Sequence, residues 1–336
     1  MSQSRGNRRE VSRGCELFRE IFLFPLVPRV KGGVAMENNS LAQKRKKSVA
    51  ICATVFLIPV FFFLIVYIFY PIIDTFIIST YKWNGISADK TFIGLANWKT
   101  LLTDKTFWTA FKHNLIIMVC SIVIQIPIGL LLATFLDFIS KKKVLSKVFK
   151  TVWFLPYLMS SVAIGFLFTY ALAANGGIIS TVSGWFGGGN VDLLGNPKTA
   201  LLTVILIIAW QFIPFYMVYA MAGYSGISTD VYEAALIDGA TRWQYFWKVA
   251  LPLLKPTLIA GAILSLVGSL KYFDLIYVMT GGGPGTSTEL MATYMYKLSF
   301  SQFNMGYGSA VAGGMFILIT AVALVANKLL NRGGED

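Results

Sequence analysis

The chain has 336 residues, of which 56% are hydrophobic and only 13% are charged, and its mean hydropathy is +0.65. A soluble domain of this length would carry roughly twice that charged fraction, so the composition excludes an ordinary soluble protein. The formal net charge of +13 does not indicate nucleic-acid binding, because the basic residues flank apolar blocks, as they do in membrane proteins.

The N-terminal segment before the first apolar block is basic. Residues 1–35 contain seven Lys or Arg and one short apolar stretch, 21–27, which Pro25 interrupts. A secretory signal needs a longer apolar region, so none is expected. Two interpretations stay open: these residues are a start-site artefact, because Lys-Gly-Gly at 31–33 can be encoded by a ribosome-binding sequence upstream of Met36, or they form a disordered basic tail.

Six apolar blocks follow the cytoplasmic tail 1–47, and each is long enough to cross a hydrocarbon core, which takes about 20 residues of helix. Prolines inside several blocks are compatible with this, because neighbouring helices and water satisfy the freed backbone groups. The sequence therefore predicts an all-α integral membrane protein with a six-span domain at 48–327 and a short tail at 328–336. The blocks run approximately over 49–73, 114–136, 151–174, 201–223, 257–279 and 307–327.

The distribution of Lys and Arg predicts the orientation. From Met36 onward, fourteen lie on one side of the predicted spans and seven on the other. Positively charged loops face the cytoplasm, so both termini and the segment 224–256 are expected there.

The cytoplasmic segment 228–256 is too regular for a simple connector. Asp230 followed by Glu233 has the spacing of a capping box, and the alanine-rich run after it favours helix. Gly239 then permits a bend. The segment resumes with an aromatic, amphipathic stretch that Pro252 and Pro256 are expected to close before the fifth span.

Two interpretations of this helix-bend-helix follow from its residues alone. Small residues on one side let another protein approach closely, while the aromatic side anchors the unit to the membrane domain. The alternative is an interfacial helix that lies on the lipid headgroups.

The segment resembles the EAA loop of binding-protein-dependent ABC importers. That pattern consists of Glu-Ala-Ala, then a glycine, then a hydrophobic residue followed by Leu-Pro. One departure is Ser228, where many members have proline; Asp230 is expected to cap the helix instead. The matching positions are Glu233, Ala234, Ala235, Asp238, Gly239, Ala240, Leu251 and Pro252.

Further stretches resemble the carbohydrate permeases of the maltose and glycerol-phosphate type, specifically the first permease of each pair. They are residues 92–114, residues 273–288 with Thr-Gly-Gly-Gly-Pro, and residues 305–310. The resemblance covers nearly all of 48–327, and a large inserted external domain found in some relatives is missing.

The resemblance implies a type I ABC importer permease in a bacterial cytoplasmic membrane. The loop, with Phe246 included among its coupling residues, would dock on a separate ABC ATPase dimer that binds ATP and magnesium. A second, homologous permease would complete the path, and an extracytoplasmic solute-binding protein would deliver a carbohydrate, with a di- or oligosaccharide favoured. The chain itself would need no cofactor.

Polar residues within the predicted spans are candidates for the substrate path, because such groups are costly in a membrane. Lys271 and Asp274 are three residues apart, hence expected on one helical face, with Tyr277 one turn further. Gln211 and Tyr216 flank a proline that could open a site. Alternatives stay open: an ion pair, a contact with the partner permease, or simple packing.

Other chemistries find little support. Cys15, Cys52, Cys120 and the single His113 show no metal-ligand spacing. The segment 280–288 lacks the lysine of a phosphate-binding loop and is expected to form an external turn. An ion-coupled secondary transporter and a non-transporting scaffold are the rival hypotheses; neither explains the loop. We therefore expect a non-catalytic chain.

Overall fold

The computed structural model describes residues 53–138 and 143–332 of the chain. The chain divides into two compact units, Met1–Ile68 and Phe69–Asp336. The basic tail 1–47, with the proposed start at Met36, lies outside the described residues, as does the end of the C-terminal tail. In the first unit, residues 53–64 are α-helical and η1 (Ile65–Phe69), a π-helical turn, follows.

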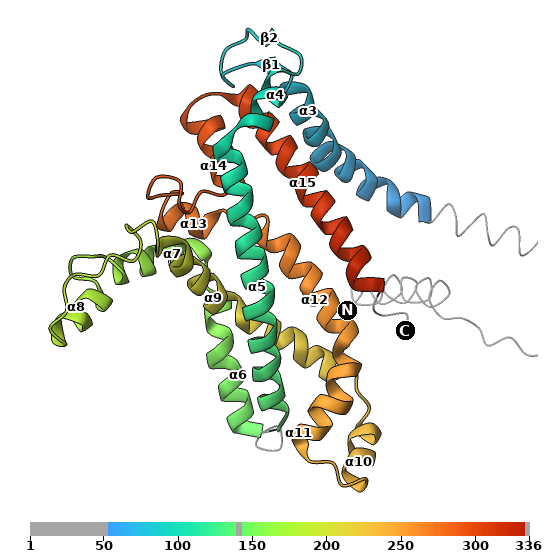
Figure 1. The fold of residues 1–336 in the computed structure, drawn as a ribbon. Coiled ribbons are helices and arrows are strands. Elements are labelled where there is room, and N and C mark those ends of the chain that lie inside the picture. The colour runs from blue at the N-terminus through green and yellow to red at the C-terminus, as the bar shows by residue number, and fades with distance from the viewer. Residues whose placement is uncertain (1–52, 139–142, 333–336) are drawn as a thin grey trace, which may run out of the picture. The chain divides into compact units, whose positions relative to one another are not determined.

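The second unit consists of helices and one short antiparallel hairpin (Figure 1). The hairpin pairs β1 (Tyr81–Lys82) with β2 (Thr91–Phe92). The helices before the segment 228–256 are α3 (Tyr70–Ile78), α4 (Ala96–Thr103), α5 (Lys105–Phe138), α6 (Lys143–Leu158), α7 (Ser161–Ala171), α8 (Ile178–Trp185) and α9 (Ala200–Tyr224). The helices from the start of that segment onward are α10 (Thr229–Ile237), α11 (Arg242–Tyr245), η2 (Phe246–Ala250), α12 (Leu251–Ser269), α13 (Asp274–Met279), α14 (Met291–Tyr296), η3 (Lys297–Ser301) and α15 (Met305–Arg332).

Five helices in the described part of the chain are long and apolar enough to cross a membrane, and a bent pair brings the number to six. The bent pair is Val144–Leu158 with Ser161–Ala171, whose axes differ by 90°. The other helices are Ala53–Ile78, Lys105–Phe138, Ala200–Tyr224, Arg242–Ser269 and Met305–Leu329.

The third apolar block, 151–174, is therefore not one straight helix as its composition suggested. Ser160 has an extended backbone (ψ 133°) that ends α6 and starts α7. Close packing holds α7 in the turned position, because a Cβ on Gly165 would lie 2.9 Å from Val278 Cγ1 of α13. The contact between α7 and α13 decides the direction of α7, and hydropathy carries no information about it.

The fifth block, 257–279, is also broken. Helix α12 ends at Ser269 and α13 starts at Asp274. The buried amide of Asn114, on α5, donates to the carbonyls of Ser269 (3.4 Å) and Leu270 (3.3 Å) and accepts from Met291 N (3.0 Å). The bonds to Ser269 and Leu270 satisfy carbonyls that an unbroken helix would have paired internally, as a membrane interior requires, and the bond from Met291 N satisfies an amide at the start of α14.

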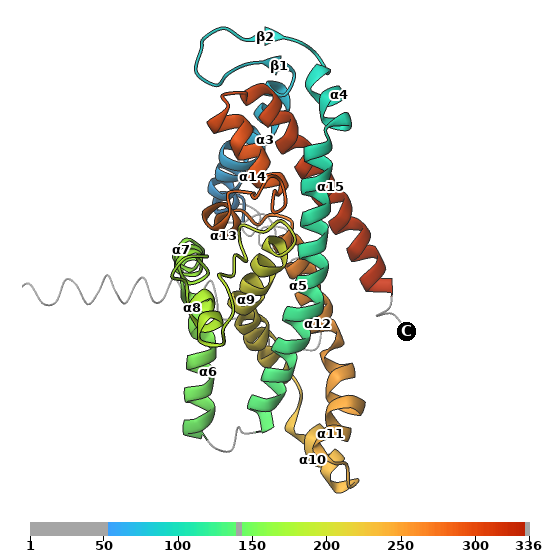
Figure 2. The same ribbon diagram turned by 60° about the vertical axis from the view of Figure 1, so that its left-hand side comes forward.

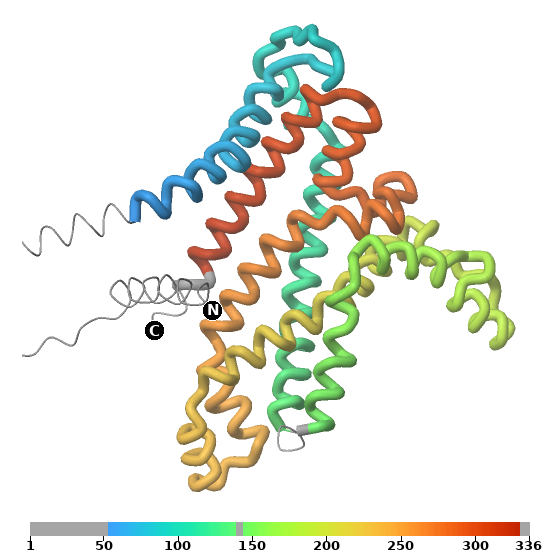
Figure 3. The backbone as a smooth tube through the Cα atoms, turned by 180° about the vertical axis from the view of Figure 1, so that it is seen from behind, coloured from blue at the N-terminus to red at the C-terminus, as the bar shows by residue number. Residues whose placement is uncertain are grey.

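Helices α5 and α9 form the centre of the second unit (Figures 2 and 3). They approach closely at Gly129, where a Cβ would lie 2.8 Å from the backbone nitrogen of Met217. Near the ends of these helices next to α10 and α11, a cluster of buried apolar side chains joins α5, α9 and α12. Its members are Leu130, Ala133, Leu136, Met217, Ala220, Phe246 and Leu254.

Candidate functional site: the coupling segment and a buried polar cluster

The first helix of the segment 228–256, α10, has its N-cap two residues before the predicted cap, Asp230. The Ser228 side chain accepts a hydrogen bond from Asp230 N at 3.2 Å and is the N-cap. The expectation that Asp230 caps the helix was therefore wrong: Asp230 lies in the first turn, where its charge favours the helix N-terminus. Serine is an effective N-cap residue, so the replacement of the usual proline does not leave the helix start uncapped.

The bend after α10 occurs at the predicted glycine. Gly239 has φ +76° and no atom within 4 Å of the position that a Cβ would occupy. Thr241 then starts α11 with a capping box, in which its side chain accepts from Gln244 N and the Gln244 side chain accepts from Thr241 N. This Thr-x-x-Gln spacing is visible in the sequence and was overlooked there.

The two prolines after the bend do not end a helix. Residues Arg242–Ser269 form one continuous helical segment, which contradicts the expectation that Pro252 and Pro256 close the loop. The π-helical turn η2 comes immediately before Pro252, which lies in the first turn of α12. Proline lacks the amide hydrogen and crowds the preceding turn, and a wider turn of this kind relieves that conflict.

The coupling residues divide by exposure into three groups. Phe246 is only 2% exposed and belongs to the buried cluster of α5, α9 and α12, so it anchors the segment to the membrane domain from inside. Ala235, Ala240 and Leu251 are half-buried. The remaining predicted coupling residues are exposed: Glu233, Ala234, Asp238, Gly239 and Pro252.

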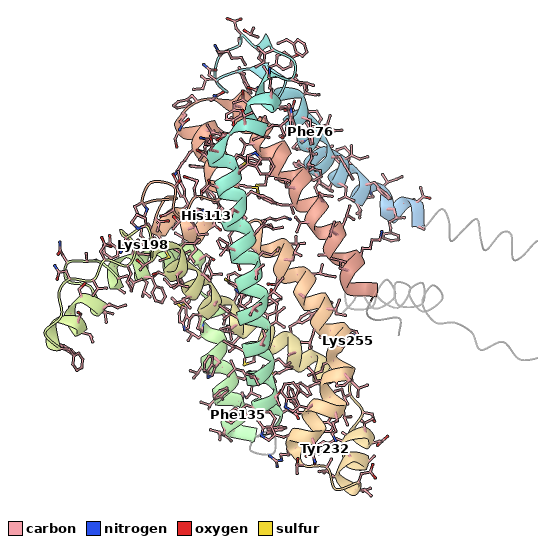
Figure 4. The ribbon with its side chains drawn as sticks, viewed as in Figure 1. Phe76, His113, Phe135, Lys198, Tyr232 and Lys255 are labelled. Carbon is pink, nitrogen blue, oxygen red and sulfur yellow. The ribbon has the colours of Figure 1, made fainter. Side chains whose placement is uncertain are left out.

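Helix α10 also exposes apolar side chains. Ile237 is 86% exposed and Leu236 47% exposed. Figure 4 places Tyr232 of this helix at the same end of the second unit as Phe135 of α5. A small helix that presents alanines, a glycine and apolar tips is suited to close contact with a partner.

A second candidate site is a cluster of buried polar side chains between α5, α9 and α12. Gln211 is 2% exposed; its Nε2 donates to Ser161 Oγ at 3.1 Å, while its Oε1 has no partner among the described residues. The buried hydroxyls of Ser265 and Ser269 have no hydrogen-bond partner of good geometry among the described residues, and only the hydroxyls of Tyr216 and Tyr272 lie close enough to interact with them. Unpaired buried polar atoms cost free energy, so they mark a place where another polar group is expected.

Aromatic rings adjoin this cluster. Tyr216, 7% exposed, lies near Ser265, and Tyr272 lies among Ser121, Gln125 and Ser269. Phe212 and Phe215 connect these tyrosines, with ring centroids 5.6 Å apart for Phe212–Tyr272 and 5.1 Å for Phe215–Tyr216. The structure thus buries two predicted residues of α9, Gln211 beside Ser161 of α7 and Tyr216 beside Ser265 of α12. Sequence reasoning missed the other members, whose hydroxyls are common in membrane helices and carry no distinctive spacing.

The other predicted path residues lie elsewhere. Lys271 is in the break between α12 and α13, and Asp274 starts α13. The expectation that they share one helical face was wrong, because that helix is interrupted between them. Both are exposed. Tyr277 stacks on Phe273 with centroids 5.1 Å apart and planes at 17°.

The glycine-rich segment 280–288 packs against the protein instead of forming a simple turn to the sixth span, because α14 and η3 intervene. Gly282 has φ +88°, and a Cβ there would lie 2.5 Å from the Glu289 carboxylate. Glu289 is 2% exposed and forms an ion pair with Lys297. The hydroxyls of Thr280 and Thr288, at the two ends of the segment, share a hydrogen bond of 2.7 Å.

Residues 125–333, from the middle of α5 to the end of α15, match the family of binding-protein-dependent transport system inner membrane components. The chain belongs to this family. The probable ABC transporter permease YurN of Bacillus subtilis is 33% identical over 283 residues, which cover 84% of this permease and 96% of YurN. The trehalose/maltose transport system permease MalF of Thermococcus litoralis is 31% identical over 296 residues, with coverage of 87% and 98%.

Solved structures agree on the fold. A chain in the crystal structure of a bacterial ABC transporter involved in the import of the acidic polysaccharide alginate superposes with a TM-score of 0.73 at 24% identity, covering 87% of this permease and 99% of that chain. The predicted fold class, a helical multi-pass membrane protein of the ABC importer permease type, is confirmed.

Proposed function

We propose that the chain is the permease subunit of an ATP-driven carbohydrate importer, with a di- or oligosaccharide as substrate. The observation that carries the proposal is the exposed helix-bend-helix α10–α11, whose matched EAA residues lie on a segment anchored by Phe246 in the bundle. Relatives named for trehalose/maltose, starch degradation products and arabinooligosaccharides support the substrate class.

The loop performs the coupling in this proposal. An ABC ATPase dimer binds ATP with magnesium and receives α10 in a groove, while this chain hydrolyses nothing. A loaded solute-binding protein engages the external side, and a second permease completes the path. Both termini and the loop face the cytoplasm, as the excess of Lys and Arg there supports. ATP and the loaded binding protein then bias the same two-state element.

The sugar path in this proposal passes the buried polar cluster. Unpaired oxygen atoms of Gln211, Ser265 and Ser269 offer hydrogen bonds to sugar hydroxyls, and the rings of Tyr216 and Tyr272 offer apolar surface. Lys271, Asp274 and Tyr277 are exposed in this single subunit, so they serve the path or the contact with the second permease.

Whether uptake requires ATP or an ion gradient distinguishes this proposal from an ion-coupled transporter. The native complex is reconstituted in proteoliposomes with its binding protein, and uptake of radiolabelled trehalose, maltotriose and arabinotriose is measured. We expect uptake of one of these sugars with internal ATP and none with an imposed proton or sodium gradient. Uptake that follows the gradient without ATP contradicts the proposal.

The polar cluster is tested by Gln211→Leu. Loss of a hydrogen bond to the sugar should raise the KM of uptake by roughly fivefold, since such a bond contributes on the order of 1 kcal/mol. Leu206→Ala, an exposed position on the same helix, is the control and should leave the KM unchanged. An unaltered KM in Gln211→Leu would exclude this glutamine from the path.

A further inference from the structure

Arg242, the first residue of α11, contacts the cytoplasmic end of α5. Its guanidinium donates to the carbonyl of Phe138 at 3.3 Å and lies 5.6 Å from the centroid of the Phe138 ring. It also acts electrostatically on the neighbouring Asp137 carboxylate. A cation that pairs with the last carbonyls of a helix stabilises that end, and arginine can contact a carbonyl and a ring at once.

A cavity of about 350 Å³ lies between the ends of α5 and α9 and the coupling segment. Its walls include Tyr224, whose hydroxyl shares a 2.8 Å hydrogen bond with Thr134. Phe246, which directly follows α11, does not line this cavity and is packed in the buried cluster of α5, α9 and α12. The segment is therefore fixed on its Phe246 side and has free space on its cavity side, where it can shift without displacing closely packed side chains.

Helix α10 is connected to α11 across the same cavity. The rings of Tyr232, on α10, and Tyr245, on α11, meet edge to face with centroids 5.0 Å apart. Tyr245 is 5% exposed. Contacts thus run from α10 through the two tyrosines to α11, and from Arg242 to α5, whose end leads to α6 (Figure 1).

We propose that Arg242 is a positioning residue that delivers movement of the docked helix α10 to the cytoplasmic end of α5. This inference rests on the proposed function, because it assigns a route for the coupling between the ATPase and the path. Phe246 fixes one part of the segment in the buried cluster, and the Arg242 contact with Phe138 transmits the movement to α5. Without that contact, α10 moves over the cavity while α5 stays in place.

The readout that separates this role from a structural one is the number of sugar molecules imported per ATP hydrolysed. It is measured in proteoliposomes that contain the full complex and its loaded binding protein, with whichever of trehalose, maltotriose and arabinotriose the wild type transports. Arg242→Met should keep assembly and stimulated hydrolysis, while sugar per ATP falls at least about fivefold, the lower range of allosteric coupling. Arg242→Lys should restore part of the ratio.

Lys248→Met is the matched control, because Lys248 is an exposed base on the same segment and should leave the ratio unchanged. A wild-type ratio in Arg242→Met overturns the inference. If Arg242→Met fails to assemble, Asp137→Asn decides: a reduced ratio supports the contact and an unchanged ratio refutes it. A wild-type complex whose hydrolysis ignores the loaded binding protein instead contradicts the proposed function itself.

Discussion

Backbone conformation is the decisive property of Gly239. Its φ of +76° belongs to the left-handed region, and the space around it is open. Any effect of a substitution therefore comes from the backbone or from the partner that docks there, since no neighbouring atom in the chain is displaced. Glycine adopts this conformation without the cost of roughly 1–2 kcal/mol that a Cβ adds.

Two variants of Gly239 distinguish the effect of backbone conformation from the effect of side-chain size. Gly239→Val should reduce ATP-driven uptake at least about tenfold, because a β-branched residue is a severe outlier at positive φ. Gly239→Asn has similar bulk and tolerates this region, so it should retain more uptake than the valine variant. Immunoblots of membranes check that both insert. Equal uptake by the two variants would argue against a conformational role.

Asp104, between α4 and α5, connects the ends of four elements. Its carboxylate accepts from the hydroxyls of Tyr294 (2.6 Å) and Tyr307 and from Thr106 N (2.8 Å) and Phe107 N (3.3 Å). Burial raises the pKa of this carboxyl, but the hydrogen bonds to Tyr294, Tyr307 and the backbone outweigh it and hold the pKa below its usual 3.8. The charged form is therefore favoured in the folded state.

A pKa lowered by folding means that stability is present above the unfolded pKa and is lost as the pH falls through the folded one. Asp104→Asn should lower the unfolding midpoint at pH 7, with a cost of about 1–3 kcal/mol for weakened charged hydrogen bonds. The difference from wild type should shrink below about pH 4. Thermal unfolding of the purified complex from pH 3 to 8 measures this. A difference that stays constant with pH would contradict the account.

At the scale of elements, the break between α12 and α13 depends on one buried side chain. Asn114→Leu leaves two carbonyls and one amide without their partner. We expect thermal stability in detergent to fall by an amount equivalent to about 2 kcal/mol or more, since each buried group left unpaired costs on the order of 1–3 kcal/mol. Asn190→Leu, which removes one exposed hydrogen bond, is the control. Equal thermal unfolding midpoints for the two variants would refute the role of Asn114 in stabilising the break.

The contrast between these elements shows what the sequence can predict. Long apolar blocks and the Glu-Ala-Ala spacing are local, so the helices and the bend at Gly239 follow from composition and pattern. The breaks at Ser160 and after Ser269 are not local: they depend on Gln211, Val278 and Asn114, far along the chain. Apolar content is continuous through the break at Ser160, and only Lys271 and Asp274 interrupt it at the second break, so a hydropathy pattern reports one span in each case.

At the scale of the whole molecule, this chain presents surfaces that need partners. Ile237, 86% exposed on α10, is expected to insert into the ATPase. Ile237→Gln should reduce the amount of ATPase that copurifies with the tagged chain by several-fold, since interface apolar anchors contribute on the order of 1–2 kcal/mol. Ile86→Gln, at a residue that is 74% exposed in the loop between β1 and β2, should have no effect. Equal recovery with both variants would exclude Ile237 from the interface.

The central claim is that this permease couples a sugar path to a separate ATPase. Its most direct test is ATP hydrolysis by the complex purified in mild detergent through this chain, with its binding protein added empty or loaded with sugar. The account predicts that a second permease and an ATPase copurify and that only the loaded binding protein raises hydrolysis. A chain that purifies alone, or hydrolysis indifferent to the loaded protein, would contradict it.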